Sequence, residues 1–129
     1  MSPVRAARAW VDWWSMTIEE IQTRIREFRD ARDWQQFHTP KDMAMAISIE
    51  AAELQEHFLW VTTEQSHSRA IDRREQIEEE IADIGIYLFE LADNLEIDLL
   101  DVIASKLKKN GEKYPVEKAR GRYLKYNEL

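Results

Sequence analysis

The sequence predicts an all-α fold of four helices packed as a bundle, and three observations support this prediction. The chain has 129 residues, 44% of them hydrophobic, which suits one domain with a single buried core. Three glycines and three prolines are too few for the many turns of a β-sandwich or barrel. Ala, Leu, Ile, Glu, Lys and Arg dominate the composition, as long helices prefer.

Capping signals mark the first two helices. Thr17 followed by Glu20 is a capping-box pattern, and apolar residues recur at helical spacing after it, which predicts a helix over 18–34. Thr39 can cap a second helix, predicted over 40–60, that begins with a proline and has an acid in its first turn. The residues between these helices break the pattern.

The second half of the chain contains two more predicted helices. Residues 61–68 are polar and are interpreted as a connection. Over 69–95 the apolar residues alternate between spacings of four and three, which is typical of a bundle seam. A fourth helix is expected over 99–110, and it stops before a Tyr-Pro pair.

Three regions are expected along the chain: an N-terminal extension over 1–15, a helical domain over 16–114 and a C-terminal arm over 115–129. The extension carries three of the five tryptophans. An interfacial helix, a partner contact and an added leader all suit it, and the leader is favoured because Met16 can itself be a start. The arm is polar, aromatic and basic, so we expect it to lie over a neighbouring surface rather than to form a packed helix.

Composition also limits the function. No cysteine is present, so a metal must be held by oxygen or imidazole ligands. The formal charge of −7 argues against a nucleic-acid binder, whose affinity rests on concentrated Lys and Arg. No apolar run approaches the roughly 20 residues of a membrane span, and the first residues lack the apolar centre of a signal peptide, so a cytoplasmic location is expected.

Two pairs of acids interrupt apolar stretches of predicted helices. Glu50 and Glu53 lie in the second helix and Glu80 and Asp83 in the third, each pair three residues apart and therefore on one helix face. Ionised carboxylates in an apolar bundle need compensation, and oxygen ligands suit Mg²⁺, with Mn²⁺ as the alternative. Either motif alone is weak in a chain with 25 acids. The other helix acids are interpreted as solvated-face charges: Glu19, Glu27, Glu75, Glu78 and Glu90.

The order and spacing of several separated motifs carry a resemblance to a known family. From Thr17 to Leu129 the chain resembles the all-α NTP pyrophosphatases, the superfamily of MazG and the dimeric dUTPases, and dCTP pyrophosphatases most of all. The matching segments are RDWQQFHTP, EAAELQEHFLW, EEEIADIGIYL, SKLKKNGEKYP and ARGRYLKY. MazG itself often has two adjacent acids where Ile49 precedes Glu50 here, and this departure favours kinship to the dCTP-type members over MazG.

The resemblance implies an activity and an assembly. The expected reaction is Mg²⁺-dependent hydrolysis of a (deoxy)nucleoside triphosphate at the α–β bond, which yields a monophosphate and pyrophosphate. dCTP or a modified dCTP is the first candidate substrate, and dATP and dUTP remain open. Relatives are oligomers with sites near subunit interfaces, so a homo-oligomer is expected, a tetramer or otherwise a dimer.

The resemblance also implies roles for named residues. The metal would bind Glu50, Glu53, Glu80 and Asp83, and Glu50 or Glu53 would be the general base. The nucleotide base would bind Trp34, His38, Trp60 and Tyr87. The phosphates would bind Lys106, Asn110, Lys113 and Tyr114. Core aromatics and a basic helix end that complements its dipole would explain the last two sets without any ligand.

Three other functions match parts of the sequence. A di-iron bundle needs two E-x-x-H motifs on separate helices, and only Glu64 to His67 fits. His57 is interpreted as a packed or rim histidine. A non-enzymatic dimerisation module would form salt bridges through the acidic pairs and need no metal. A nucleotide-binding module without catalysis is disfavoured by the intact carboxylate set.

Overall fold

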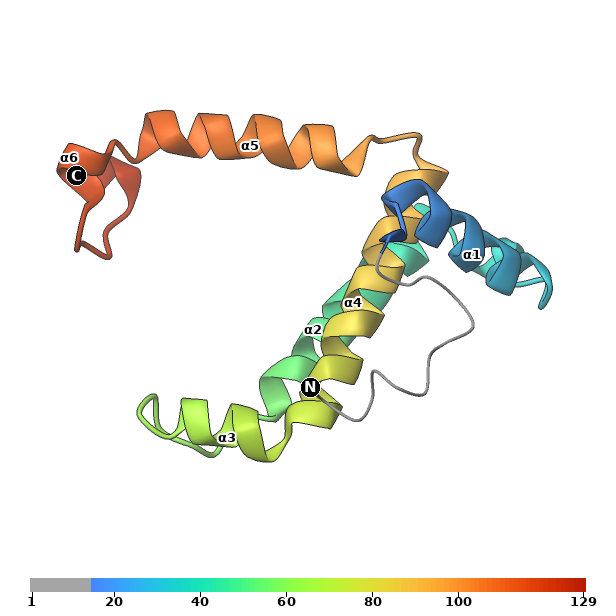
Figure 1. Ribbon diagram of the computed structural model, residues 1–129, viewed down its shortest axis with the longest axis horizontal. Coiled ribbons are helices and arrows are strands. Elements are labelled where there is room, and N and C mark those ends of the chain that lie inside the picture. Colours follow the sequence, from blue (N-terminus) through green and yellow to red (C-terminus); the bar gives the residue numbers. More distant parts are fainter. Residues whose placement is uncertain (1–14) are drawn as a thin grey trace. The chain divides into compact units, whose positions relative to one another are not determined.

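The computed structural model of the chain describes residues 15–129, where every regular element is a helix (Figure 1). The all-α prediction is confirmed for this part of the chain. The helices in chain order are α1 (Ile18–Asp30), η3 (Gln35–Phe37), α2 (Pro40–Glu56), α3 (Ser66–Asp72), α4 (Arg74–Asn94), α5 (Leu99–Lys113), α6 (Val116–Ala119) and η4 (Tyr126–Glu128). None of these helices is long and apolar enough to cross a membrane.

The chain divides into two compact units. The first extends to Leu91 and contains the helices from α1 to most of α4, and the second is Ala92–Leu129. The N-terminal extension expected over 1–15 lies outside the described residues apart from its last one. The division into a domain over 16–114 and an arm over 115–129 stays a prediction.

The predicted capping box begins α1. The Thr17 hydroxyl accepts from the Glu20 amide at 3.1 Å, and the Glu20 carboxylate accepts from the Thr17 amide at 3.2 Å. The helix ends at Asp30, earlier than expected, because Asp33 adopts a left-handed conformation with φ 53°. The Trp34 amide then donates to the Arg29 carbonyl at 3.1 Å, which closes the helix end.

The predicted cap also begins α2. The Thr39 hydroxyl accepts from the Asp42 amide at 3.2 Å, and Pro40 takes the first helical position. The helix ends at Glu56, and residues 57–60 form turns instead of the expected last turn of helix.

The single helix predicted over 69–95 is wrong, because the chain forms two helices there. The first, α3, starts within the expected connection, and Arg73, with φ −113° and ψ 29°, separates it from α4. Figure 1 shows the two helices running in different directions. Ile71 on α3 is 74% exposed and lies six residues before Ile77, so it falls outside the spacing of four and three that continues along α4.

Within the first unit, α2 and α4 lie side by side (Figure 1). They are antiparallel, since His38, just before α2, contacts Glu90, while His57, just after it, contacts Glu80. Helix α1 packs against the C-terminal half of α4, where the Gln22 amide donates to the Phe89 carbonyl at 3.1 Å. This pairing of α2 and α4 positions the acidic pairs.

The second unit is built on α5. Asp98 caps this helix by accepting from the Asp101 amide at 3.0 Å, and the helix continues to Lys113, beyond the expected stop at Asn110. The tail forms two short helices that the sequence did not predict. The Tyr126 ring packs edge-on against Tyr114, with centroids 6.2 Å apart.

Candidate functional site

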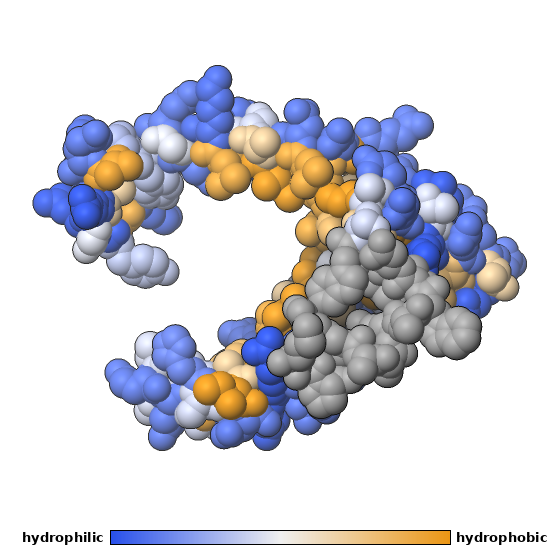
Figure 2. All heavy atoms as spheres, viewed as in Figure 1, coloured by the Kyte–Doolittle hydropathy of each residue, from blue (hydrophilic) through white to orange (hydrophobic). Residues whose placement is uncertain are grey.

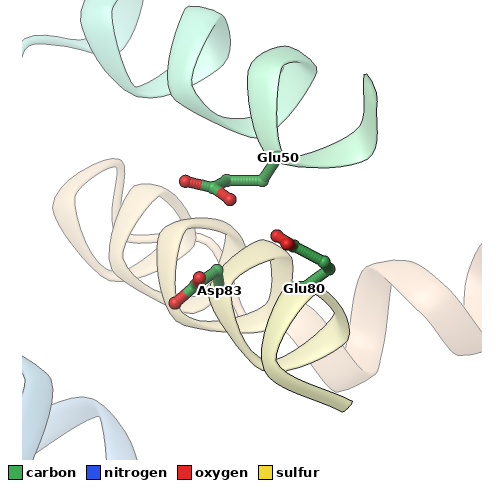
Figure 3. Close-up of side chains that lie close together, drawn as sticks. All are labelled: Glu50, Glu80 and Asp83. Atoms are coloured by element: carbon green, nitrogen blue, oxygen red, sulfur yellow. The ribbon is translucent and has the colours of Figure 1, made fainter. Parts of the chain in front are cut away.

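Three carboxylates from two helices converge in the first unit. Glu50 reaches from α2 toward Glu80 and Asp83 on α4 (Figure 3). One oxygen of each carboxylate lies within 4.8 Å of the others. The i, i+3 spacing places Glu80 and Asp83 on one face of α4, and the antiparallel packing of α2 brings Glu50 opposite them.

The surroundings of Glu50 call for a cation. Its Oε2 atom is buried, and no hydrogen-bond partner for it lies among the described residues. Burial, the hydrogen bond to Glu53 and the charges of Glu53, Asp83 and Glu80 together raise the pKa of Glu50 to about 7. A divalent ion would satisfy this oxygen and offset the repulsion, and an all-oxygen donor set fits Mg²⁺ or Mn²⁺.

Glu53 and His57 lie beside this cluster. Glu53 is exposed and falls outside the group of three, but it shares a hydrogen bond with Glu50. The Nε2 atom of His57 lies 3.8 Å from Glu80 Oε1, so this histidine borders the site, which agrees with its interpretation as a packed or rim histidine. It follows Glu50 by seven residues, two turns along the same face of the chain's helical pattern.

Tyr87 continues the same face of α4 beyond Asp83. Its side chain is half-buried. Burial raises the pKa of the Tyr87 phenol, and the charges of Glu50, Asp83, Glu90 and Glu53 add to this effect. The phenol therefore lies within electrostatic reach of both the carboxylate cluster and Glu90.

Trp34 and His38 lie next to each other on the segment that joins α1 to α2. Their ring centroids are 6.3 Å apart and the rings are tilted by 47°. Trp34 also packs edge-on against Phe28, with centroids 5.8 Å apart, and remains 42% exposed. The pair thus offers a partly accessible aromatic surface.

Glu90 corrects the sequence interpretation of a solvated-face charge. It is only 3% exposed and its carboxylate lies 2.8 Å from His38 Nδ1. Arg29 from α1 is 4% exposed, and its guanidinium lies 3.6 Å from the same oxygen. The helical pattern of α4 alone cannot reveal this burial, because α1 and the segment before α2 cover the residue.

Comparison with known proteins identifies the family. Residues 45–129 match the MazG-like family. Over 115 residues the chain is 38% identical to dCTP pyrophosphatase 1 of Bos taurus and 37% identical to the Homo sapiens protein. These matched residues make up 88% of this chain and 68% of each relative. A pyrophosphatase from Archaeoglobus fulgidus has a similar crystal structure, with a TM-score of 0.74 and 44% identity over 76% of this chain and 92% of that one.

The chain belongs to the MazG-like family. The prediction that it is an enzyme, a nucleoside triphosphate pyrophosphohydrolase, is confirmed. The cluster of Glu50, Glu80 and Asp83 is the metal-binding candidate of this MazG-like chain.

Trp60 is not joined to the carboxylate cluster of the MazG-like fold. It is 91% exposed and lies in the turns after α2. Among the described residues, no ring contact, hydrogen bond or ion pair connects it with the cluster. It lines an open depression of about 380 Å³ with Val61, Gln65, Ser68, Arg69 and Asp72. Its assignment to the nucleotide base stays a prediction.

The expected phosphate-binding residues belong to the second unit. Lys106, Asn110 and Lys113 follow one another at spacings of four and three on one side of α5, and Tyr114 is the C-cap. The Lys113 ammonium group lies 5.0 Å from the centre of the Tyr126 ring. Their role toward phosphates stays a prediction.

Proposed function

We propose that this MazG-like enzyme hydrolyses a deoxynucleoside triphosphate, with dCTP or a modified dCTP as first candidate, between its α and β phosphates. The observation that carries the proposal is the convergence of Glu50, Glu80 and Asp83 around a buried carboxylate oxygen that has no hydrogen-bond partner within residues 15–129. The relatives named dCTP pyrophosphatase 1 support the choice of substrate. Removal of surplus or damaged deoxynucleotides is the corresponding cellular role.

The metal-binding role is assigned to Glu50, Glu80 and Asp83. When bound, Mg²⁺ would neutralise charge on the triphosphate and lower the pKa of a water molecule. Mn²⁺ would suit the same oxygens. Glu53, which is exposed and shares a hydrogen bond with Glu50, is either the fourth ligand or the general base.

The reaction needs one proton acceptor. Water attacks the α-phosphorus, the bond from this phosphorus to the bridging oxygen breaks, and pyrophosphate leaves. The attacking water loses its proton to a carboxylate, and Glu53 is favoured for this task because it is exposed and does not belong to the group of three carboxylates. Glu50 is the alternative base.

Substrate binding is assigned to two groups of side chains. Trp34 and Tyr87 supply flat surfaces on which a base can stack, and His38 can form a hydrogen bond with its edge. Lys106, Asn110, Lys113 and Tyr114 are donors that suit phosphate oxygens. Trp60 remains a candidate for the base on the strength of the resemblance alone.

We also propose that the enzyme is a homo-oligomer, a tetramer or otherwise a dimer. Figure 2 shows apolar side chains gathered along one face of α5. On this face Leu100, Ile103 and Leu107 are 60%, 46% and 65% exposed. An apolar stripe this exposed is typical of a surface that a second subunit covers. A cytoplasmic location stays a prediction.

The reaction is tested with a panel of dNTPs and NTPs in Mg²⁺ or EDTA and separation of the products. We expect monophosphate and pyrophosphate with Mg²⁺, no turnover with EDTA, and a loss of at least about a hundredfold in Asp83→Asn. Glu79→Gln is the matched control, since Glu79 is exposed on α4 beside Glu80. No turnover of any nucleotide by folded wild-type protein would refute the proposal.

Calorimetric titration of Mg²⁺ into Glu53→Gln separates the two roles of Glu53. Unchanged Mg²⁺ affinity together with a large loss of kcat identifies a general base. Weakened affinity identifies a fourth ligand. Glu56→Gln, an exposed acid at the end of α2, serves as the control.

A further inference from the structure

Glu90 is a buried acid to which the proposed reaction assigns no role. It lies on α4 with 3% of its surface exposed, and two groups from elsewhere in the first unit contact one of its oxygens. His38 Nδ1 is 2.8 Å from this oxygen and the Arg29 guanidinium is 3.6 Å from it. A carboxylate in such a place is costly unless these partners compensate it.

The Arg29 guanidinium lies 3.6 Å from the Glu90 carboxylate and offsets its charge. A guanidinium stays protonated in proteins, and Arg29 is itself buried, which strengthens its attraction for the acid. An ionised carboxylate can only accept hydrogen bonds. Nδ1 of His38 must therefore carry the hydrogen and donate it to Glu90.

This hydrogen bond decides what the opposite ring nitrogen can do. A neutral imidazole with its hydrogen on Nδ1 has an acceptor at Nε2. An acceptor pairs with the exocyclic amine of cytosine or adenine, whereas uracil and thymine present a carbonyl oxygen at the corresponding position. If Nε2 accepts a hydrogen bond from the amine of the base, a uracil or thymine would place its carbonyl oxygen against this nitrogen. Two acceptors cannot form a hydrogen bond with each other, so the site disfavours these bases.

The row of side chains on α4 connects Glu90 with the reaction site. Tyr87 precedes Glu90 by one turn and follows Asp83 by one turn. Its phenol is within electrostatic reach of Glu50, Asp83 and Glu90. Trp34, whose ring centre is 6.3 Å from that of His38, adds a stacking surface beside the histidine.

We propose that Glu90 is a positioning residue, which holds His38 in the tautomer with hydrogen on Nδ1 and thereby makes the enzyme select bases with an exocyclic amine over uracil and thymine. This inference rests on the proposed function, in which His38 contacts the base.

The tautomer is measured directly by ¹⁵N NMR of the histidine side chains at pH 8, with His38→Gln to assign the signals. We expect hydrogen on Nδ1 in the wild-type protein. In Glu90→Gln the amide can donate as well as accept, so the Nε2–H form gains population. A wild-type His38 with hydrogen on Nε2 overturns the inference, and this result needs neither turnover nor a folded Glu90 variant.

The selectivity is measured as the ratio of kcat/KM for dCTP to that for dUTP. Glu90→Gln is expected to lower this ratio on the order of tenfold, mainly through KM for dCTP. When Glu90→Gln is added to a His38→Ala variant, the ratio is expected to stay unchanged, because Glu90 acts on the base only through His38. An unchanged ratio in Glu90→Gln, or an equal effect in the His38→Ala background, overturns the inference.

Failure of the proposed function is distinguishable from these outcomes. If the wild-type enzyme cleaves no nucleotide to monophosphate and pyrophosphate, the reaction is refuted and the selectivity with it. If it cleaves nucleotides and the Glu90→Gln ratio is unchanged, only the role of Glu90 is refuted.

Discussion

Glu50 and Glu53 are one helical turn apart on α2, yet their surroundings differ. Glu50 has a buried oxygen and faces Glu80 and Asp83, whereas Glu53 is exposed. The sequence spacing predicts that both lie on one side of the helix, but the distance of each from α4 decides its environment. For this reason the two acids are assigned different tasks.

The stability of the metal-free enzyme should depend on pH through Glu50. Its pKa in the folded protein, about 7, exceeds the ordinary value of 4.5, so the folded state binds the proton more tightly than the unfolded chain. The stabilisation from this proton is complete below about pH 4.5 and is lost as the pH rises through about 7. The loss is on the order of 1–2 kcal/mol after allowance for solvent screening.

Urea unfolding in EDTA from pH 5 to 8 measures this effect. Relative to Glu50→Gln, the wild-type protein should lose stability across this range, while Glu56→Gln should follow the wild type. Parallel pH curves for wild type and Glu50→Gln would contradict the assignment.

Tyr87 should contribute to binding of the nucleotide base through its ring rather than through its hydroxyl. Stacking of a base on an aromatic ring contributes about 1–3 kcal/mol, which corresponds to roughly 5- to 150-fold in binding. Tyr87→Ala should therefore raise KM for the preferred dNTP by this factor, and Tyr87→Phe should change it less than about threefold. Steady-state kinetics check both variants, and equal KM values for Phe and Ala would show that the ring does not stack on the base.

At the scale of elements, left-handed residues end α1 and α4 where the sequence has no glycine. Glu96 has φ 55°, and the Ile97 amide donates to the Ala92 carbonyl at 2.8 Å, the same closure that Asp33 allows after α1. A side chain in this conformation is strained, and aspartate tolerates it better than glutamate. These ends were hard to predict because the usual glycine signal is absent.

Replacement of Glu96 by glycine should stabilise the protein. Glycine removes the strain of the left-handed backbone but loses more chain entropy on folding, which leaves a net gain of about 0.5–1 kcal/mol. Urea unfolding measures the gain, with Glu96→Ala as the control that keeps a Cβ atom and gains nothing. Equal stability of the two variants would indicate that the left-handed conformation costs little.

At the scale of the whole molecule, few apolar side chains among the described residues are buried within the single chain. These are Met43, Ile77, Ala92 and Leu99, and many large apolar side chains remain exposed. A domain that buries so little of its apolar surface gains stability by association. The exposed face of α5 is the part of this surface with the clearest helical spacing.

Leu107→Glu should shift the oligomer toward smaller species, because a charge would enter an apolar contact. Ser105→Glu, which lies on the other side of α5, adds the same charge and should leave the assembly intact. Light scattering coupled to size exclusion gives the mass of each variant. A monomeric wild-type enzyme, or two variants of equal mass, would contradict this use of the α5 face.

The sequence by itself determined the features that depend on local interactions. The helix class, the caps at Thr17 and Thr39, and the shared faces of the acidic pairs follow from spacing and backbone hydrogen bonding within a few residues. The tertiary structure alone decided which acids meet. Glu50 joins Glu80 and Asp83, Glu53 stays outside, and Glu90 is buried against Arg29 and His38. These outcomes depend on contacts between helices far apart in the chain, and the period of one helix contains no information about what covers it.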